Sequence, residues 1–175
     1  MMVRLPIAFV IFLVVSFGQP IVPPKDVNGW SSAEWGMTEG QITNAFKGEK
    51  LSKGKMDNLF IPDFKIGRNR FMIVFVMDEQ KKLLNRVNIV PVDEVPGYDG
   101  PVINPRPESI YDDVKTLLIS KYGQPTNTGA TRPGNMAAVW RFKSTTIELD
   151  VSTFSIGTFL TLNYRQNAKG DLDKI

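Results

Sequence analysis

The carboxylates with the most suggestive spacing are Glu148 and Asp150, two residues apart. On a β-strand, residues i and i+2 point to the same face, so these side chains resemble the carboxylate pair of a glycosidase. The expected hairpin register places Arg141 opposite Glu148, and a cross-strand ion pair is the simpler interpretation. A carboxylate-based hydrolase therefore stays open only as an alternative.

The chain of 175 residues contains no cysteine and no histidine. These absences exclude Ser-His-Asp and Cys-His nucleophiles, disulfides, and zinc, haem or iron-sulfur sites with their usual ligands. Asp93, Glu94 and Asp99 cluster among Pro and Gly, but their spacing matches no calcium loop. We therefore expect no cofactor, no metal site and no catalytic residue, and interpret the protein as non-catalytic.

Two further segments carry candidate binding residues. The ten-residue segment Thr126 to Asn135 is polar and is predicted to be a loop, in which Arg132 could bind a carboxylate or phosphate. It lacks the lysine and following helix of a phosphate-binding loop. Trp30 and Trp35 lie near glycines and could stack on sugars; Trp35 fits a core position better, which leaves Trp30 as the freer candidate.

The N-terminus has the pattern of a signal peptide over residues 1–18. Arg4 precedes an apolar run from Leu5 to Val15, and Ser16 to Gly18 matches a small-x-small cleavage site. The run is too short to span a bilayer as a helix, so we expect export to the periplasm or the extracellular space and no membrane span in the mature form. Removing residues 1–18 lowers Lys+Arg from 21 to 20 against 18 Asp+Glu, a net charge of +2. Scattered basic residues without an aromatic stripe give nucleic-acid binding no support.

After a proline-containing leader at 19–29, the pattern predicts one α+β domain at 30–165 and a flexible tail at 166–175. The domain divides into two αβββ halves, 30–95 and 107–165, which form an antiparallel sheet with helices packed on one face. In the first half, Thr38 and Gln41 form a capping box, and the helix presents Ile42, Ala45 and Phe46. Its predicted strands are Leu59 to Ile66, Phe71 to Asp78 and Leu84 to Val92.

In the second half, a helix is predicted from Pro107 to a C-terminal Gly123. Its apolar stripe has a period of 3.6 residues and consists of Ile110, Val114, Leu117, Leu118 and Tyr122. The predicted strands are Met136 to Lys143, Thr145 to Val151 and Thr158 to Arg165.

The hairpin within the second half has a predicted register. A two-residue loop at Ser144 and Thr145 would place Phe142 opposite Ile147 and Trp140 opposite Leu149, which gathers the large apolar side chains on one face. Arg141, Phe159 and Thr161 would then point away from the core.

The segment from Phe71 to Met77 is apolar at every position and therefore on both faces. A central strand with its second face covered by loops or the leader is the favoured interpretation. The alternative is an exposed apolar patch that contacts a partner or a second subunit.

Two short motifs carry a family resemblance: Trp35-Gly36-Met37-Thr38 followed by Gln41-Ile42, and Lys121-Tyr122-Gly123-x-Pro125 followed by Trp140. They resemble secreted bacterial proteins of the β-lactamase-inhibitor-protein-like fold, a class that includes the small lipoprotein of the outer-membrane barrel-assembly machinery. The resemblance implies helices on one face of an antiparallel sheet and an opposite face free to bind a protein. The chain lacks the lipobox cysteine of that lipoprotein, and no functional residue transfers.

These observations predict an exported, non-catalytic binding or accessory protein. We expect it to recognise another envelope or extracellular protein through the outward sheet face and the adjacent loop. The candidate binding residues are Arg132, Arg141, Phe159, Thr161 and Trp30. The alternatives are the carboxylate-based hydrolase and a structural homodimer.

Overall fold

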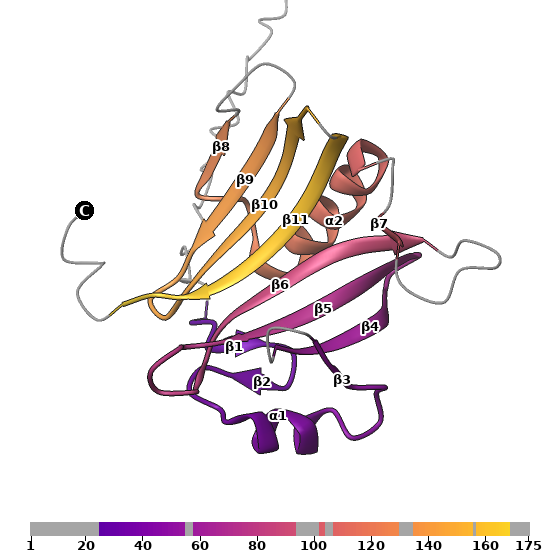
Figure 1. Cartoon of the computed structure of the whole chain (residues 1–175). Helices are drawn as coiled ribbons and strands as arrows, with labels where there is room; N and C mark the ends of the chain where they lie inside the picture. The colour runs from indigo at the N-terminus through magenta and orange to yellow at the C-terminus, as the bar shows by residue number, and fades with distance from the viewer. Residues whose placement is uncertain are drawn as a thin grey trace, which may run out of the picture.

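The computed structural model describes residues 25–54, 58–93, 102–103, 107–129, 135–155 and 157–168. The predicted signal peptide, residues 19–24 of the leader and most of the predicted tail lie outside this part of the chain. Two helices and an extended antiparallel sheet make up the described structure (Figure 1). In chain order the elements are β1 (Gly29–Trp30), β2 (Ala33–Glu34), α1 (Glu39–Ala45), β3 (Ser52–Lys53), β4 (Leu59–Ile66), β5 (Asn69–Met77), β6 (Leu84–Asp93), β7 (Val102–Ile103), α2 (Pro107–Tyr122), β8 (Asn127–Gly129), β9 (Met136–Arg141), β10 (Thr145–Phe154) and β11 (Gly157–Gln166).

The sheet is antiparallel throughout, which confirms the predicted α+β class. Across the part of the chain described, its strand order is β3-β4-β5-β6-β11-β10-β9-β8, with β7 paired to β6 beside this path and β1-β2 forming a separate hairpin. The two central strands come from distant parts of the sequence: β6 pairs with β11 through Ile89 with Leu162 and Val87 with Tyr164. This pairing joins strands β3 to β6 to strands β8 to β11 in one sheet (Figure 1).

Helix α1 begins as predicted at a capping box. The backbone N–H of Thr38 donates to Gln41 Oε1 at 2.8 Å, and the Gln41 N–H donates to Thr38 Oγ1 at 3.4 Å. Ile42 and Phe46 are buried, but Ala45 is exposed, so its assignment to the apolar face was wrong. Within the seven-residue helix only Ile42 is buried, and Phe46, the residue that caps its C-terminus, is buried beyond it.

Helix α2 also runs as predicted and ends at Gly123, which has a φ of +81°. Val114 and Leu118 are buried against β10 and β11, as the stripe requires. Leu117, however, is 43% exposed, and Tyr111 is buried at 4% exposure although the predicted stripe omitted it. The face of α2 that packs on the sheet is therefore rotated about the helix axis relative to the predicted face, toward Tyr111 and away from Leu117.

The core lies between the sheet and both helices. In β5, Phe71, Ile73 and Phe75 have no exposed surface. Phe75 also packs against Phe46, which follows α1, with ring centroids 5.2 Å apart. Because the same buried face continues across β6, β11 and β10, both helices cover one side of the sheet; in Figure 1, α2 lies behind β11 and β6.

The β9-β10 hairpin has a different register from the predicted one. Ile147 pairs with Trp140 and Leu149 with Ala138, and the Phe142 N–H donates to the Thr145 carbonyl at 2.8 Å. The two-residue loop is therefore Lys143 and Ser144. A shift of two positions leaves every side chain on its predicted face, so the apolar pattern could not exclude it.

Contacts from outside the hairpin hold this register. The Asn167 amide donates to the Phe142 carbonyl at 2.8 Å, and the Asn167 N–H donates to the Ser144 carbonyl at 3.0 Å. Asp26 accepts two hydrogen bonds from Ser144. Trp35 Nε1 also donates to the buried Thr145 Oγ1 at 2.7 Å, which ties β10 to the segment just before α1.

The predicted loop from Thr126 to Asn135 was partly wrong. Residues Asn127–Gly129 form the edge strand β8, which pairs with β9 through Thr128 and Ala138. Residues 130–134, including Arg132, lie outside the described residues. Within the part described, neither helix is long and apolar enough to cross a membrane.

Candidate functional site

The face of the sheet opposite the helices carries most of the residues that the sequence singled out. Strand alternation puts the odd-numbered side chains of β5 in the core and the even-numbered ones on this outward face. One row of cross-strand partners crosses it from β4 to β8 and consists of Phe60, Val74, Asn88, Asn163, Glu148, Val139 and Asn127. No helix of the described chain lies over this row.

An apolar strip occupies the first half of the outward face. Met72, Val74 and Val76 on β5 are partly exposed, and Val90 on β6 pairs with Met72. The apolar run at Phe71 to Met77 thus belongs to an internal strand with one face fully buried. The apolar side chains on its second face remain partly exposed to solvent. Exposed apolar patches of this kind are common at protein–protein contacts.

Three arginines form a second row at one end of the outward face. Arg86 on β6 pairs with Arg165 on β11, Arg165 with Thr146 on β10, and Thr146 with Arg141 on β9. Like charges placed directly opposite each other are unfavourable. Arg165 lies 3.7 Å from Glu148, whereas Arg86 and Arg141 have no carboxylate within salt-bridge distance in the described structure. This row attracts anions.

The predicted partner of Glu148 was wrong. With the observed register, Arg141 faces Thr146, and Glu148 instead contacts Arg165 across the β10-β11 pair. Asp150 accepts a hydrogen bond from the Ser152 hydroxyl on its own strand. The two carboxylates therefore have separate polar partners, Arg165 for Glu148 and Ser152 for Asp150.

The amide of Asn88 lies at the middle of the outward face. Asn88 on β6 pairs with Asn163 on β11 and with Val74 on β5. Its Oδ1 is buried and has no hydrogen-bond partner among the described residues. A buried acceptor without a donor costs free energy. A rotation of this amide toward a bound partner would remove that cost.

Phe159 and Thr161 lie on the outward face as predicted, toward the end of β11 away from the arginine row. Phe159 pairs with Ser152, and Thr161 with Asp150. The Phe159 ring lies 6.1 Å from that of Phe154, which is 57% exposed. Sequence reasoning missed Phe154 because it placed the end of β10 at Val151, three residues too early.

Trp30 does not lie on the outward face, and its assignment as the freer tryptophan was wrong, because it is buried. It is 7% exposed and stacks on Phe46 with ring centroids 5.9 Å apart. Its edge also meets Phe64 at 5.4 Å. The β1-β2 hairpin folds Trp30 into the core, whereas the neighbouring glycine suggested an open position.

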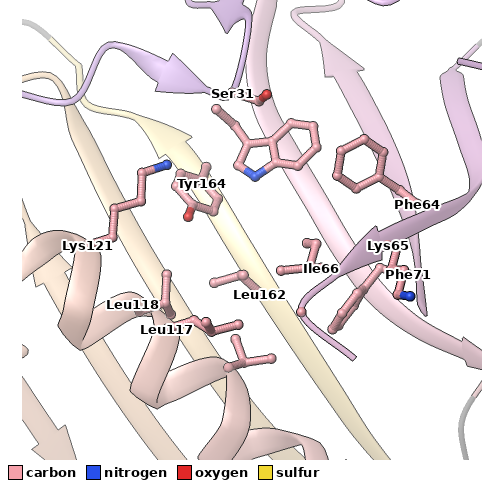
Figure 2. Close-up of a pocket in the computed structure, with 13 residues that line it drawn as sticks. Ser31, Phe64, Lys65, Ile66, Phe71, Leu117, Leu118, Lys121, Leu162 and Tyr164 are labelled. Carbon is pink, nitrogen blue, oxygen red and sulfur yellow. The ribbon is translucent and has the colours of Figure 1, made fainter. Parts of the chain in front are cut away.

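A pocket of about 350 Å³ lies on the helix side of the sheet, and sequence reasoning missed it. Figure 2 shows its walls, with Phe64, Ile66 and Phe71 on one side and Leu117, Leu118 and Leu162 on the other. The first set comes from β4 and β5 and the second from α2 and β11, so the pocket exists only where these segments meet. No local motif could have predicted it.

The polar groups of this pocket gather mainly at one end. Lys121, Tyr164 and Ser31 lie there, and Lys65 lies on the opposite side (Figure 2). Burial raises the pKa of Tyr164 well above its ordinary value, and the Tyr122 hydroxyl beside it raises it further, so the Tyr164 hydroxyl stays protonated. That hydroxyl donates to Tyr122 Oη at 3.5 Å. Ser31 holds a φ of +53°, which is uncommon for a residue other than glycine.

Comparisons of the chain with protein-family models, with curated proteins and with solved structures find no match.

Proposed function

We propose that this protein is a non-catalytic recognition module that binds another protein through the outward face of its sheet. The observation that carries the proposal is the combination, on one helix-free face, of the apolar strip with the arginine row. Protein interfaces commonly place apolar contacts at the centre and charged groups at the rim.

The apolar strip would supply the buried centre of such an interface. Met72, Val74, Val76 and Val90 lie on the adjacent strands β5 and β6, so they form one contiguous patch. A partner that binds over this patch would bury its remaining exposed apolar surface, which favours association. The unpaired Asn88 acceptor lies beside the patch and could receive a hydrogen bond from the partner.

The arginine row indicates the charge of the partner. Arg86 and Arg141 have no carboxylate partner in the described part of the chain. Arg165 forms a long ion pair with Glu148, with 3.7 Å between the guanidinium nitrogen and the carboxylate oxygen. Guanidinium groups bind carboxylates with two parallel hydrogen bonds. An acidic segment of the partner would therefore lie along the end of the sheet formed by these three residues.

The proposal extends to the architecture and the location of the protein. The order α1-β3-β4-β5-β6 parallels α2-β8-β9-β10-β11, and the sheet places β6 beside β11, β5 and β10 next, and β4 and β9 beyond them. This symmetry supports two αβββ halves and agrees with the resemblance to the β-lactamase-inhibitor-protein-like fold. The N-terminal pattern supports export, so the partner would be an envelope or extracellular protein.

A capture experiment tests the proposal. The purified protein, immobilised, would be exposed to the envelope fraction of its own cells, and bound proteins would be identified and then titrated individually. We expect one acidic partner in a defined stoichiometry. The variant Val74→Glu places a charge in the apolar strip, and Arg86→Glu with Arg141→Glu reverses the arginine row; each should weaken binding at least tenfold, about 1.4 kcal/mol.

Matched controls separate recognition from misfolding and from general charge. The double variant Lys47→Glu with Lys50→Glu makes the same charge change at exposed residues that follow α1 and belong to no strand of the outward face, and it should leave binding intact. Thermal midpoints would show that all variants fold. Capture that persists unchanged in both face variants would contradict the proposal. Concentration-dependent sedimentation that Val74→Glu abolishes would instead favour the homodimer.

A further inference from the structure

The pocket of Figure 2 lies on the other side of the sheet from the proposed recognition face, and its lining defines a ligand class. Eight of its lining residues are Trp30, Phe64, Ile66, Phe71, Val114, Leu117, Leu118 and Leu162, all of them apolar. A volume of about 350 Å³ is at the lower end for small-molecule sites. The pocket therefore fits one medium-length hydrocarbon chain better than a fused ring system or a two-chain lipid.

The charged residues that line the pocket all have one sign. Its lining includes Lys121 and Lys65 and no carboxylate. No described carboxylate lies within salt-bridge distance of either ammonium group. Lys121 Nζ does lie 5.0 Å from the ring centroid of Tyr122, a contact that holds the ammonium near the pocket end without neutralising it. An anionic group entering here would meet uncompensated positive charge.

The end of the pocket at Lys121 also holds polar groups. Figure 2 shows Lys121, Tyr164 and Ser31 at the same end of the pocket. Leu117 lies on the α2 wall with 43% of its surface exposed, although it is apolar. A hydrocarbon chain packed against Leu117 would cover this surface, and a head group at Lys121 would keep contact with water.

We propose that this pocket binds a single-chain amphipathic anion, with the hydrocarbon chain between α2 and strands β4 and β5 and the anionic head at Lys121. A free fatty acid has this chemistry, and so does a single-chain lipid with an anionic head group. The site is independent of the outward face, so its ligand and the protein partner can be tested separately.

The test compares ligands that share one chain and differ in the head group. Decanoate, decyl phosphate, decanol and decyltrimethylammonium would be titrated calorimetrically into the purified protein below their micelle concentrations. We expect one saturable site for decanoate or decyl phosphate, with decanol at least fivefold weaker and the cation weakest. The tighter of the two anions distinguishes a carboxylate head from a phosphate head.

Two variants locate the site. Lys121→Met keeps an apolar stem and removes the charge, so it should weaken the anions about tenfold and leave decanol unchanged. Lys115→Met is the matched control, since Lys115 also lies on α2 beside a tyrosine ring, that of Tyr111 at 5.6 Å, but does not line the pocket. Ile66→Trp should fill the pocket and abolish binding of every decyl ligand.

Several results would overturn the proposal. These are the absence of saturable binding by any of the four ligands, equal affinity for anion and cation, and full binding by a folded Ile66→Trp protein. Equal losses in Lys121→Met and Lys115→Met would also overturn the head-group assignment, because they would report only the net charge of the helix. None of these results depends on whether a protein partner is captured.

Discussion

Asp26 accepts two hydrogen bonds from Ser144, 118 residues further along the chain: one from the backbone N–H at 2.9 Å and one from the hydroxyl at 2.6 Å. Ser144 is half of the two-residue turn between β9 and β10. The carboxylate therefore connects the segment before β1 to the turn that sets the register of the second hairpin. It is one of the contacts that distinguish the observed register from the predicted one.

Replacing Asp26 with Asn should destabilise the protein by about 1 kcal/mol, because two hydrogen bonds to a charged but largely accessible carboxylate are lost or weakened. Burial by itself would raise the pKa of Asp26, but the hydrogen bonds from Ser144 outweigh it and the net pKa is lowered. The contribution should therefore be complete at neutral pH and disappear as the pH falls below about 4. Urea unfolding of both proteins between pH 7 and pH 2.5 measures this difference.

Glu79→Ala is the control for this experiment, since Glu79 is exposed and no hydrogen bond or ion pair among the described residues joins it to the turn. Its stability relative to the wild type should stay constant over the same range. A gap between wild type and Asp26→Asn that stays constant or widens below pH 4 would show that the carboxylate does not hold the turn.

Truncating side chains on the two faces of β5 should destabilise the protein by different amounts. Ile73→Ala removes a side chain with no exposed surface and should cost about 2–5 kcal/mol, because it leaves a cavity in the core. Val74→Ala, one position along on the outward face, should cost less than about 1 kcal/mol. Equal losses in chemical unfolding would mean that another part of the chain covers the outward face.

Two glycines differ in what a methyl group would meet. At Gly29, φ is +130° and an added Cβ would overlap the carbonyl oxygen of Ala33, so Gly29→Ala should open the β1-β2 hairpin and sharply lower the thermal midpoint. At Gly40, in the first turn of α1, nothing lies within 4 Å of an added Cβ. Gly40→Ala should therefore stabilise the protein by about 0.4–1 kcal/mol.

The rate of association with the protein partner should fall as the ionic strength rises. The arginine row contributes Arg86, Arg165 and Arg141 at accessible positions, where charge interactions are screened. Association rates measured by surface plasmon resonance at ionic strengths of about 0.05 M and 0.5 M should differ severalfold, and Arg86→Glu with Arg141→Glu should remove most of the difference. A rate that is insensitive to salt would mean that the apolar strip alone guides binding.

Much of the local structure was predictable from the sequence. The capping box at Thr38, the termination of α2 at Gly123, and the strand alternation that buries Phe71 and Ile73 depend on neighbouring residues or on fixed periods. Backbone geometry imposes those periods in any context. For the same reason, Phe159 and Thr161 were predicted correctly on the outward face.

Three kinds of feature were not predictable. A register shift of two residues leaves every side chain on the same face, so strand alternation cannot detect it. The cross-strand partner of Glu148 was therefore assigned wrongly. Burial depends on what packs against a position. Trp30, which was expected to be exposed, is therefore buried, and Leu117, which was expected to be buried, is exposed. The pocket and the arginine row require residues from separate strands, and their proximity arises from the β6-β11 pairing.

The sequence by itself determined that thiol and imidazole side chains are missing and which side chains share a face of each element, because composition and backbone periodicity need no information about distant contacts. Only the tertiary structure decided which strands are neighbours, how the second hairpin is aligned and where a ligand-sized space remains. Those features depend on long-range contacts such as the one between Asp26 and Ser144, whose geometry no local pattern encodes.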